Sequence, residues 1–337
     1  MERILVTGAG GFIGSHLAKY LLSEGHFVRI ADIKFDDYIH EKYYSERLKL
    51  DLRKQENCLK ATEGIDKVYN LAANMGGIGF ITSVSADVMH DNVLINTYML
   101  KASIQNKVKR FLFSSSACVY PNYKQTSANV AGLKEEDVYP ADPNEAYGWE
   151  KLFTEEMLKA YQTDYNLDIR IVRYHNIYGP EGTYDGGREK APAALCRKVA
   201  QASDPGTITI WGDGKATRSY CYIDDCVRGT VALMESDYDK PLNIGSDRLV
   251  SVDELADIIT EISGKRLTKT YDTSAPEGVR GRNADLTLVK KVLSWEPEVS
   301  LEEGLEKTYL WIEKMVEKDK VRVGADVDKS FVGTGRF

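Results

Sequence analysis

Cysteine is scarce in this sequence of 337 residues, and long apolar runs are missing. The five cysteines are scattered and odd in number, and none shows the C-x-x-C spacing of a zinc site or redox centre. No apolar stretch approaches the roughly 18 residues of a membrane span, and the first residues enter a strand pattern without signal-peptide features. We therefore expect a cytoplasmic protein with mostly buried thiols, no metal site and no membrane segment.

An excess of positive charge is also missing. The formal net charge is -7 at pH 7, whereas proteins that bind nucleic acid need clustered Lys and Arg to displace counterions from the phosphate backbone. The 43% share of hydrophobic residues is sufficient for a large core. A compact globular protein that does not bind nucleic acid is the expectation.

Short apolar strands alternate with helical segments in the first half of the chain. A strand at residues 3–7, a helix at residues 14–24 and a strand at residues 27–31 form one βαβ unit. Three more such strands follow between helical stretches, at residues 67–71, 110–114 and 169–173. This alternation predicts an α/β fold with a doubly wound parallel sheet of the Rossmann type.

A glycine-rich loop joins the first strand to the first helix. Residues 7–14 (TGAGGFIG) would let a pyrophosphate approach backbone N–H groups at the helix N-terminus. Asp32 ends the second strand, where a carboxylate can bind the adenosine ribose and repel a 2′-phosphate, so NAD is favoured over NADP. An Asp and a Leu after the third strand could frame the adenine, although an Asp that begins a loop is common. The expected NAD contacts are Gly8, Gly11, Phe12, Ile13, Gly14, Asp32, Asp51 and Leu52, together with Tyr147 and Lys151 further along the chain.

The pattern changes in the second half of the chain. From about residue 179, Gly-rich and charged segments surround isolated strands such as residues 207–211 and 241–244. We predict an NAD-binding Rossmann domain at residues 1–178. Residues 179–337 are expected to form mainly a smaller α/β substrate domain, with some segments returning to the first domain.

Tyr147 and Lys151 lie four residues apart in a predicted helix, so both side chains point from one face. We expect the ammonium of Lys151 to lower the pKa of the phenol and to make Tyr147 a base for a sugar hydroxyl during hydride removal. A Tyr-x-x-x-Lys spacing alone is frequent by chance. It gains weight here from the glycine loop and from Ser116, which closes a serine run at a strand end.

These motifs together resemble the extended short-chain dehydrogenase/reductase family over essentially the whole chain. Within that family, four segments are similar to the GDP-mannose 3,5-epimerases. They are residues 74–80 (NMGGIGF), 115–121 (SSACVYP), 186–194 (GGREKAPAA) and 276–282 (PEGVRGR). The resemblance implies a GDP-sugar substrate and a redox step with NAD that is run by Ser116, Tyr147 and Lys151. It also implies that Cys118 and Lys190 form an acid/base pair.

The implied chemistry is epimerisation through a 4-keto sugar. Oxidation at C4 acidifies the hydrogens on C3 and C5, so a thiolate can remove a proton from one face while an ammonium returns one to the other. Hydride return to C4 then restores the alcohol. Inversion at both carbons would convert GDP-D-mannose to GDP-L-galactose, and inversion at C5 alone would give GDP-L-gulose. Taken singly, Cys118 would more often be a buried hydrophobe and Lys190 an exposed charge, so the assignment depends on their combination with the redox residues.

Further polar residues are candidates for substrate binding. Arg218 and Arg282 are suited to bidentate contact with a diphosphate, and Lys198 could add a third positive charge, although each could also be a solvated surface charge. Ala216 stands where the resemblance leads us to expect a longer polar residue, which puts one contact in doubt. The expected substrate contacts are Gly76, Gly77, Ser116, Asn176, Glu189, Lys190, Lys198, Arg218 and Arg282.

Two alternatives and one assembly question stay open at this point. The chain could be another nucleotide-sugar 4-epimerase or 4,6-dehydratase of the family, which Cys118 with Lys190 argues against. It could also be a dinucleotide-sensing regulator without turnover, which would have no use for Tyr147 and Lys151. A homodimer formed through helices, one of them carrying Tyr147, is expected by analogy with the family.

Overall fold

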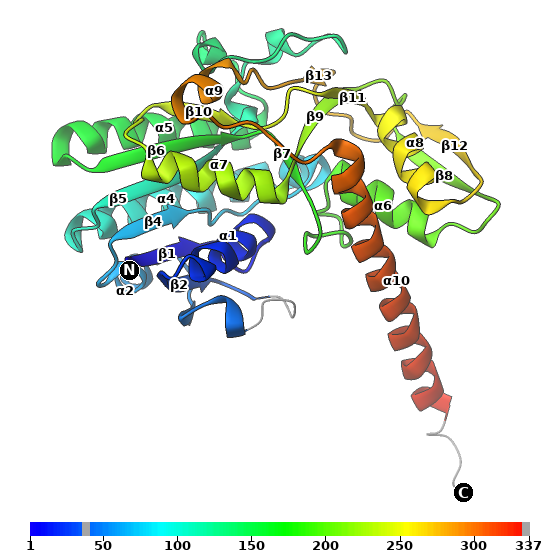
Figure 1. Ribbon diagram of the computed structural model, residues 1–337, viewed down its shortest axis with the longest axis horizontal. Helices are drawn as coiled ribbons and strands as arrows, with labels where there is room; N and C mark the ends of the chain where they lie inside the picture. The colour runs from blue at the N-terminus through cyan, green and yellow to red at the C-terminus, as the bar shows by residue number, and fades with distance from the viewer. Residues whose placement is uncertain (36–40, 332–337) are drawn as a thin grey trace, which may run out of the picture.

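Seven parallel strands form the central sheet of the molecule (Figure 1). The structure is a computed structural model that describes residues 1–35 and 41–331, the side chains of residues 41 and 321–331 excepted. The strand order is β10-β6-β5-β4-β1-β2-β3, and every neighbouring pair is parallel. The strands are β1 (Arg3–Thr7), β2 (Phe27–Asp32), β3 (Glu46–Lys49), β4 (Lys67–Asn70), β5 (Arg110–Ser116), β6 (Asp168–Tyr174) and β10 (Pro241–Ile244). The predicted doubly wound parallel sheet is confirmed.

Helices cover both faces of this sheet because successive residues of a buried strand point to opposite sides. In β1, Ile4 belongs to the core cluster that contains Leu17, whereas Leu5 belongs to the cluster that contains Met99 and Leu158. The first face carries α1 (Phe12–Ser23) and α7 (Ile223–Glu235), and the second carries α2 (Gln55–Thr62), α4 (Ser85–Gln105) and α5 (Glu145–Tyr165) (Figure 1).

A smaller part lies beyond the carboxyl end of β6, because β7 follows β6 directly and pairs with β9 rather than with the large sheet. One small sheet has the order β11-β9-β13 with β7 beside β9, and a second consists of β12 and β8. Its strands are β7 (Asn176–Tyr178), β8 (Gly206–Trp211), β9 (Thr217–Tyr222), β11 (Leu249–Ser251), β12 (Leu267–Asp272) and β13 (Gly281–Arg282). The remaining helices are α3 (Ile78–Ser83), α6 (Ala191–Gln201), α8 (Val252–Ser263), α9 (Thr287–Leu293) and α10 (Leu301–Phe331). Short 3-10 turns occur at η1 (Glu41–Tyr43), η2 (Ala117–Val119), η3 (Asn122–Lys124) and η4 (Glu135–Val138).

The structure corrects the placement of two short strands. The sequence grouped residues 241–244 with the C-terminal region, but β10 pairs with β6 at the edge of the large sheet. It is thus a segment that returns to the first half, whereas β7, before residue 179, belongs to a small sheet. Local patterns identify such strands but not their partners, because pairing is a long-range choice.

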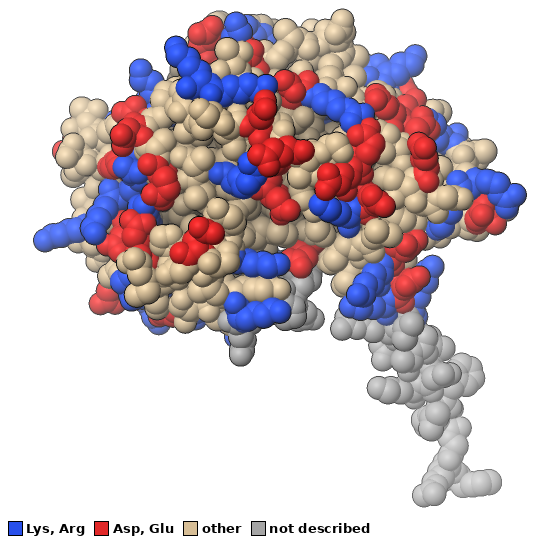
Figure 2. All heavy atoms as spheres, viewed as in Figure 1, with Lys and Arg blue, Asp and Glu red and all other residues tan. Residues whose placement is uncertain are grey.

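Charged side chains are interspersed over the visible face of the molecule, with basic and acidic groups side by side (Figure 2). Several of them pair on the surface, for example Arg248 with Glu302 and Lys307 with Glu303. Such exposed pairs contribute little to stability. Among the described helices, none is both long enough and apolar enough to cross a membrane.

The start of α5 packs against the turn after β5 without room for a side chain. A Cβ on Gly148 would lie 2.2 Å from the carbonyl oxygen of Cys118, and the same oxygen accepts a hydrogen bond from the N–H of Asn144 at 2.9 Å. Further along, the buried carboxylate of Glu155 pairs with Arg173 of β6 at 2.7 Å. These contacts fix α5 along the carboxyl ends of β5 and β6.

We predict that Gly148→Ala lowers the stability of the fold. Alanine in a helix normally gains about 1 kcal/mol over glycine, but here the added carbon collides with the Cys118 carbonyl. The expected net loss in the free energy of unfolding is about 1–3 kcal/mol, measured by urea denaturation.

Gly79→Ala in α3 is the matched control, because a Cβ there meets no described atom within 4 Å. This variant should be as stable as the wild type or slightly more stable. A Gly148→Ala protein that unfolds at the same or higher urea concentration would contradict the tight contact.

Candidate active site

The glycine loop before α1 has the shape of an anion cradle. Gly8 has a φ of +68°, a Cβ on Gly10 would lie 1.9 Å from the Lys34 carbonyl oxygen, and a Cβ on Gly14 would lie 2.4 Å from that of Gly8. Only glycine fits this path. No side chain caps the N-terminus of α1, so Phe12 and Ile13 begin the helix with N–H groups available to a pyrophosphate. The chain therefore fits a dinucleotide at this loop.

The predicted ribose and adenine contacts lie at the carboxyl ends of β2 and β3. Asp32 ends β2 and accepts a hydrogen bond from the N–H of Gly10 at 2.9 Å; burial raises the pKa of its carboxyl against the opposing effect of its backbone hydrogen bonds. Asp51 follows β3, and Arg53 holds both of its carboxylate oxygens at 2.9 and 3.0 Å. Leu52 is buried.

Ser116, Tyr147 and Lys151 come together where α5 meets the end of β5. The hydroxyl of Ser116 favours the ionised form of the Tyr147 phenol and accepts from the N–H of Cys118 at 3.2 Å. The ammonium of Lys151 lies 5.4 Å from the centre of the Tyr147 ring. The structure thus brings together the three residues that the sequence grouped for a redox step.

The expected effect of Lys151 on the Tyr147 phenol is wrong for the chain as described. Burial raises the pKa of Tyr147 well above its ordinary value, and the charges of Cys118 and Glu150 act in the same direction. Burial also lowers the pKa of Lys151, which weakens its influence as a cation. Tyr147 therefore carries its proton at neutral pH. A sequence shows the i, i+4 spacing but not that both groups are buried.

Cys118 has the electrostatic surroundings of a reactive thiol. Burial alone would raise its pKa, but several neighbours act against it, the largest contribution coming from the guanidinium of Arg282, whose Nη1 lies 3.4 Å from Sγ. A hydrogen bond from Ser116 and the charge of Lys190 act in the same direction, so the pKa of Cys118 is lowered. The thiolate is therefore favoured at this position.

Lys190 is exposed over the residue as a whole, but desolvation of its ammonium by the surrounding protein lowers the pKa; the charge of Cys118 opposes this effect and that of Arg282 adds to it. Lys190 precedes α6 as its N-cap. A lysine with a lowered pKa gives up its proton more readily than an ordinary surface lysine. Cys118 and Lys190 are thus a thiol and an amine whose pKa values both move towards neutrality.

The other four cysteines are buried, as expected from the sequence, and burial raises the pKa of each thiol. They are Cys58, Cys196, Cys221 and Cys226. Cys118 is the half-buried exception.

The remaining predicted substrate contacts with polar side chains lie on β7, β9, β13 and α6. Arg218 and Arg282 are register partners on β9 and β13, and burial together with the charge of Arg282 lowers the pKa of Arg218 to about 10. Lys198 donates to the Thr209 carbonyl at 2.6 Å. Asn176 donates to the Ser219 carbonyl at 3.0 Å.

The two predicted glycines and Glu189 meet across a narrow contact. The N–H of Gly77 donates to the Arg188 carbonyl at 3.0 Å, and a Cβ on Gly77 would lie 2.6 Å from the carbonyl oxygen of Glu189; Gly76 packs against Phe80. The Oε1 of Glu189 pairs with Arg197 at 3.0 Å, while its Oε2 is buried without a described hydrogen-bond partner.

Ala216, the position at which the sequence led us to expect a longer polar residue, is buried. Its carbonyl accepts a hydrogen bond from the N–H of Val252 at 3.0 Å.

A model of the NAD dependent epimerase/dehydratase family matches residues 4–245, most of the chain. The chain belongs to this family. This confirms the resemblance seen in the sequence, and NAD is the cofactor of the enzyme.

Several named enzymes are similar to this chain. GDP-mannose 3,5-epimerase 1 of Oryza sativa subsp. japonica is 50% identical over 326 residues, which cover 96% of this chain and 85% of the rice protein. A UDP-glucose 4-epimerase from Thermotoga maritima with UDP-glucose superposes with a TM-score of 0.85 at 29% identity, covering 93% of this chain and 99% of that one. A UDP-glucuronic acid 4-epimerase from Bacillus cereus, in complex with UDP-glucuronic acid and NAD, gives 0.80 at 29% identity with the same coverage.

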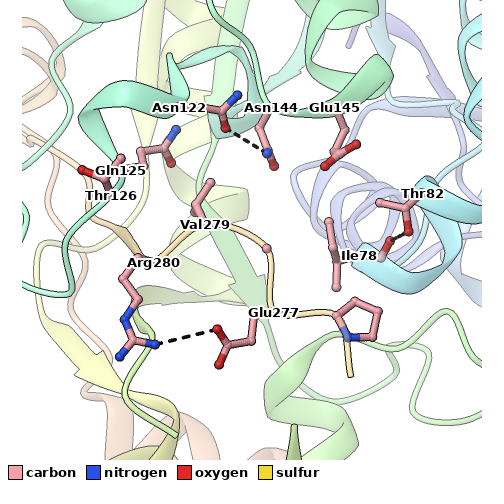
Figure 3. A pocket seen from close by; sticks show the side chains of 12 residues that line it. Ile78, Thr82, Asn122, Gln125, Thr126, Asn144, Glu145, Glu277, Val279 and Arg280 are labelled. Carbon is pink, nitrogen blue, oxygen red and sulfur yellow. Dashed lines mark hydrogen bonds and ion pairs between the residues drawn. The ribbon is translucent and has the colours of Figure 1, made fainter. Parts of the chain in front are cut away.

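Sequence reasoning missed two features of this epimerase-family site. Gln125 is buried, and its side-chain oxygen accepts from Nε of Arg282 at 2.5 Å, which orients the guanidinium towards Cys118. A pocket of about 460 Å³ lies beside it, with Asn144 donating to Asn122 on one side and Glu277 facing Arg280 on the other (Figure 3). Neither feature has a local signal, because the participating residues come from separate loops.

We predict that Cys118 alkylates faster at neutral pH than an ordinary thiol and that Arg282→Gln slows it. Removal of the guanidinium charge takes away the main support of the thiolate, so the pH midpoint of alkylation should move upwards. The measurement is the rate of iodoacetamide labelling against pH, followed by mass spectrometry of the Cys118 peptide.

Arg280→Gln is the matched control, because Arg280 pairs with Asp213 at 2.8 Å and is not in contact with the thiol. It should leave the midpoint unchanged. Equal midpoints in the wild type and Arg282→Gln would show that Arg282 does not set the thiol pKa.

Proposed function

We propose that this chain converts GDP-D-mannose to GDP-L-galactose by inversion at C3 and C5, with GDP-L-gulose as the product of inversion at C5 alone. The observation that carries the proposal is the Cys118 thiol, held in its reactive form by Arg282 beside the Ser116 and Tyr147 hydroxyls. The 50% identity over 96% of the chain to a protein named GDP-mannose 3,5-epimerase 1 supports this substrate.

The cofactor is proposed to lie along the carboxyl edge of the large sheet. NAD, when bound, accepts a hydride from C4 of the sugar and later returns it. Asp32 would bind the adenosine ribose, and Asp51 and Leu52 would flank the adenine. The pyrophosphate would be bound by the loop residues Gly8, Gly11, Phe12, Ile13 and Gly14.

Tyr147 is proposed to exchange the proton of the C4 hydroxyl, with Ser116 favouring the ionised phenol and Lys151 beside the ring. Removal of that proton accompanies oxidation of the alcohol. The raised pKa of Tyr147 suits the reverse step, in which the phenol returns the proton to the oxygen on C4 as the ketone is reduced.

Cys118 and Lys190 are proposed to exchange the protons on carbon. One group takes the proton from C5 or C3 of the ketone, and the other delivers a proton to the opposite face, so that the carbon is inverted. A thiolate and an ammonium are suited to these two roles because the pKa values of both move towards neutrality.

Substrate binding is proposed for the polar groups that surround this pair. Arg218, Arg282 and Lys198 would bind the diphosphate or neighbouring oxygens, since they carry positive charge and Arg218 and Arg282 are register partners on β9 and β13. The sugar would be held by Ser116, Lys190 and the residues Gly76, Gly77, Asn176 and Glu189.

A homodimer is proposed through the outer faces of α4 and α5. Met89 of α4 and Trp149 and Phe153 of α5 are large apolar side chains exposed to solvent. These two helices also pack against each other on one side of the sheet. Burial of such residues against a second copy would remove apolar surface from water.

The cellular location and the domain division are proposals as well. The described cysteines are all free, the state that a reducing cytoplasm maintains. We keep the division into an NAD-binding part at residues 1–178 and a mainly substrate-binding part at residues 179–337.

Incubation of the purified protein with GDP-mannose in D₂O should place deuterium at C3 and C5 and form GDP-L-galactose, measured by NMR of the recovered sugar. Cys118→Ala and Lys190→Ala should each lower the exchange by about 10² to 10⁴ while NAD content is unchanged. Cys58→Ala and Lys215→Ala are the matched controls, because Cys58 lies in α2 and Lys215 is exposed.

Deuterium at C3 and C5, with the two control variants exchanging as fast as the wild type, supports the proposal. NAD-bound protein that neither exchanges deuterium nor forms product would contradict the assignment of GDP-mannose as the substrate. Release of a 4-keto-6-deoxy sugar would identify a dehydratase, and inversion at C4 alone a 4-epimerase.

A further inference from the structure

Lys190 ends a segment that begins with two glycines and whose main chain does little to fix its conformation. Gly186 and Gly187 have φ values of +88° and +81°, and a Cβ on either would meet no described atom within 4 Å. No described residue forms a hydrogen bond or an ion pair with the Lys190 ammonium, and the neighbouring charges act on it only at a distance. The position of this ammonium therefore depends on what holds residues 188 and 189.

Arg188 fastens this segment to the residues that run into α3. Its guanidinium carbon lies 3.7 Å from the centre of the Phe80 ring, and its Nη1 donates to the Met75 carbonyl at 3.4 Å. Its own carbonyl accepts from the N–H of Gly77 at 3.0 Å. Both the side chain and the main chain of Arg188 thus contact residues 75–80, two residues before Lys190.

The neighbouring contact shows how closely the two segments meet. A Cβ on Gly77 would lie 2.6 Å from the carbonyl oxygen of Glu189, so the main chains touch there without a side chain between them. Movement of Arg188 away from Phe80 would open this contact. Lys190, which follows Glu189 and begins α6, would move with it.

We propose that Arg188 is a positioning residue, which holds Lys190 in place at the start of α6 by stacking on Phe80 and bonding to the main chain of residues 75–77. Arg188 is exposed and is itself placed in no binding or proton-transfer role. The inference rests on the proposed function, because it assigns Lys190 to proton exchange at carbon.

Looser placement of Lys190 should change the products and not only the rate. After oxidation at C4, proton exchange at the second carbon competes with hydride return to the ketone. If exchange slows and hydride return does not, more sugar leaves after a single inversion. A shift from GDP-L-galactose to the singly inverted sugar is therefore a signature that simple loss of folded protein would not produce.

For Arg188→Ala we expect kcat for doubly inverted product to fall about 10- to 100-fold, the ratio of singly to doubly inverted product to rise, and KM and NAD content to stay near wild-type values. Arg188→Lys should restore part of the activity, because a cation can still stack on Phe80. Phe80→Leu should reproduce the Arg188→Ala ratio, and the double variant should be no worse than either single one.

A second measurement does not depend on turnover. Acetylation of Lys190 against pH, followed by peptide mass spectrometry, should give a midpoint below that of exposed lysines in the wild type, and a higher midpoint in Arg188→Ala because the released ammonium is better hydrated. Arg266→Ala is the matched control, since Arg266 is a surface arginine paired with Asp204.

An unchanged product ratio and an unchanged acetylation midpoint in Arg188→Ala would overturn the inference. A raised midpoint in a protein whose wild type forms no epimerised sugar would instead overturn the proposed function and leave the positioning of Lys190 standing. The two failures are therefore distinguishable.

Discussion

The close approach of α5 to the turn after β5 is the constraint on which the site depends. Gly148 lets the helix backbone reach the carbonyl of Cys118, and only a residue without a Cβ permits that distance. Tyr147 and Lys151 belong to the same helix and are carried with it, while Ser116 and Cys118 belong to the turn. One main-chain contact thus joins the redox residues to the thiol in a fixed arrangement, and the buried pair further along α5 stabilises it.

The pKa of Tyr147 is raised and that of Cys118 is lowered, although both belong to one site, because the Arg282 guanidinium lies against the thiol and not against the phenol. Burial acts against ionisation of both Tyr147 and Cys118. Arg282, oriented by Gln125, places its guanidinium against the thiol and, together with Ser116 and Lys190, reverses the balance there. The Lys151 ammonium, 5.4 Å from the centre of the Tyr147 ring, does not reverse the effect of burial on the phenol, which keeps its proton. A thiol that favours its ionised form and a phenol that keeps its proton therefore lie in the same site.

Predictions from sequence patterns were reliable where all the residues of a pattern lie in one short segment. The glycine loop before α1, the strand that ends at Ser116 and the spacing of Tyr147 and Lys151 were all readable from short stretches, and the parallel sheet followed from the alternation of strands and helices. The partner of β10 was not readable, because strand pairing joins residues far apart in the chain. Arg282 was recognised as a cation for substrate, but its contact with Cys118 could not be foreseen.

The sequence by itself determined the fold class, the cofactor loop and the identities of the groups at the centre, because these depend on periodicity, on turns that require glycine and on residue types at set spacings. Only the tertiary structure decided how those groups are tuned. The pKa values of Tyr147, Cys118 and Lys190 depend on burial and on charges from β13, α5 and the loop before α6. Those elements are distant in the chain and become neighbours only when the protein is folded.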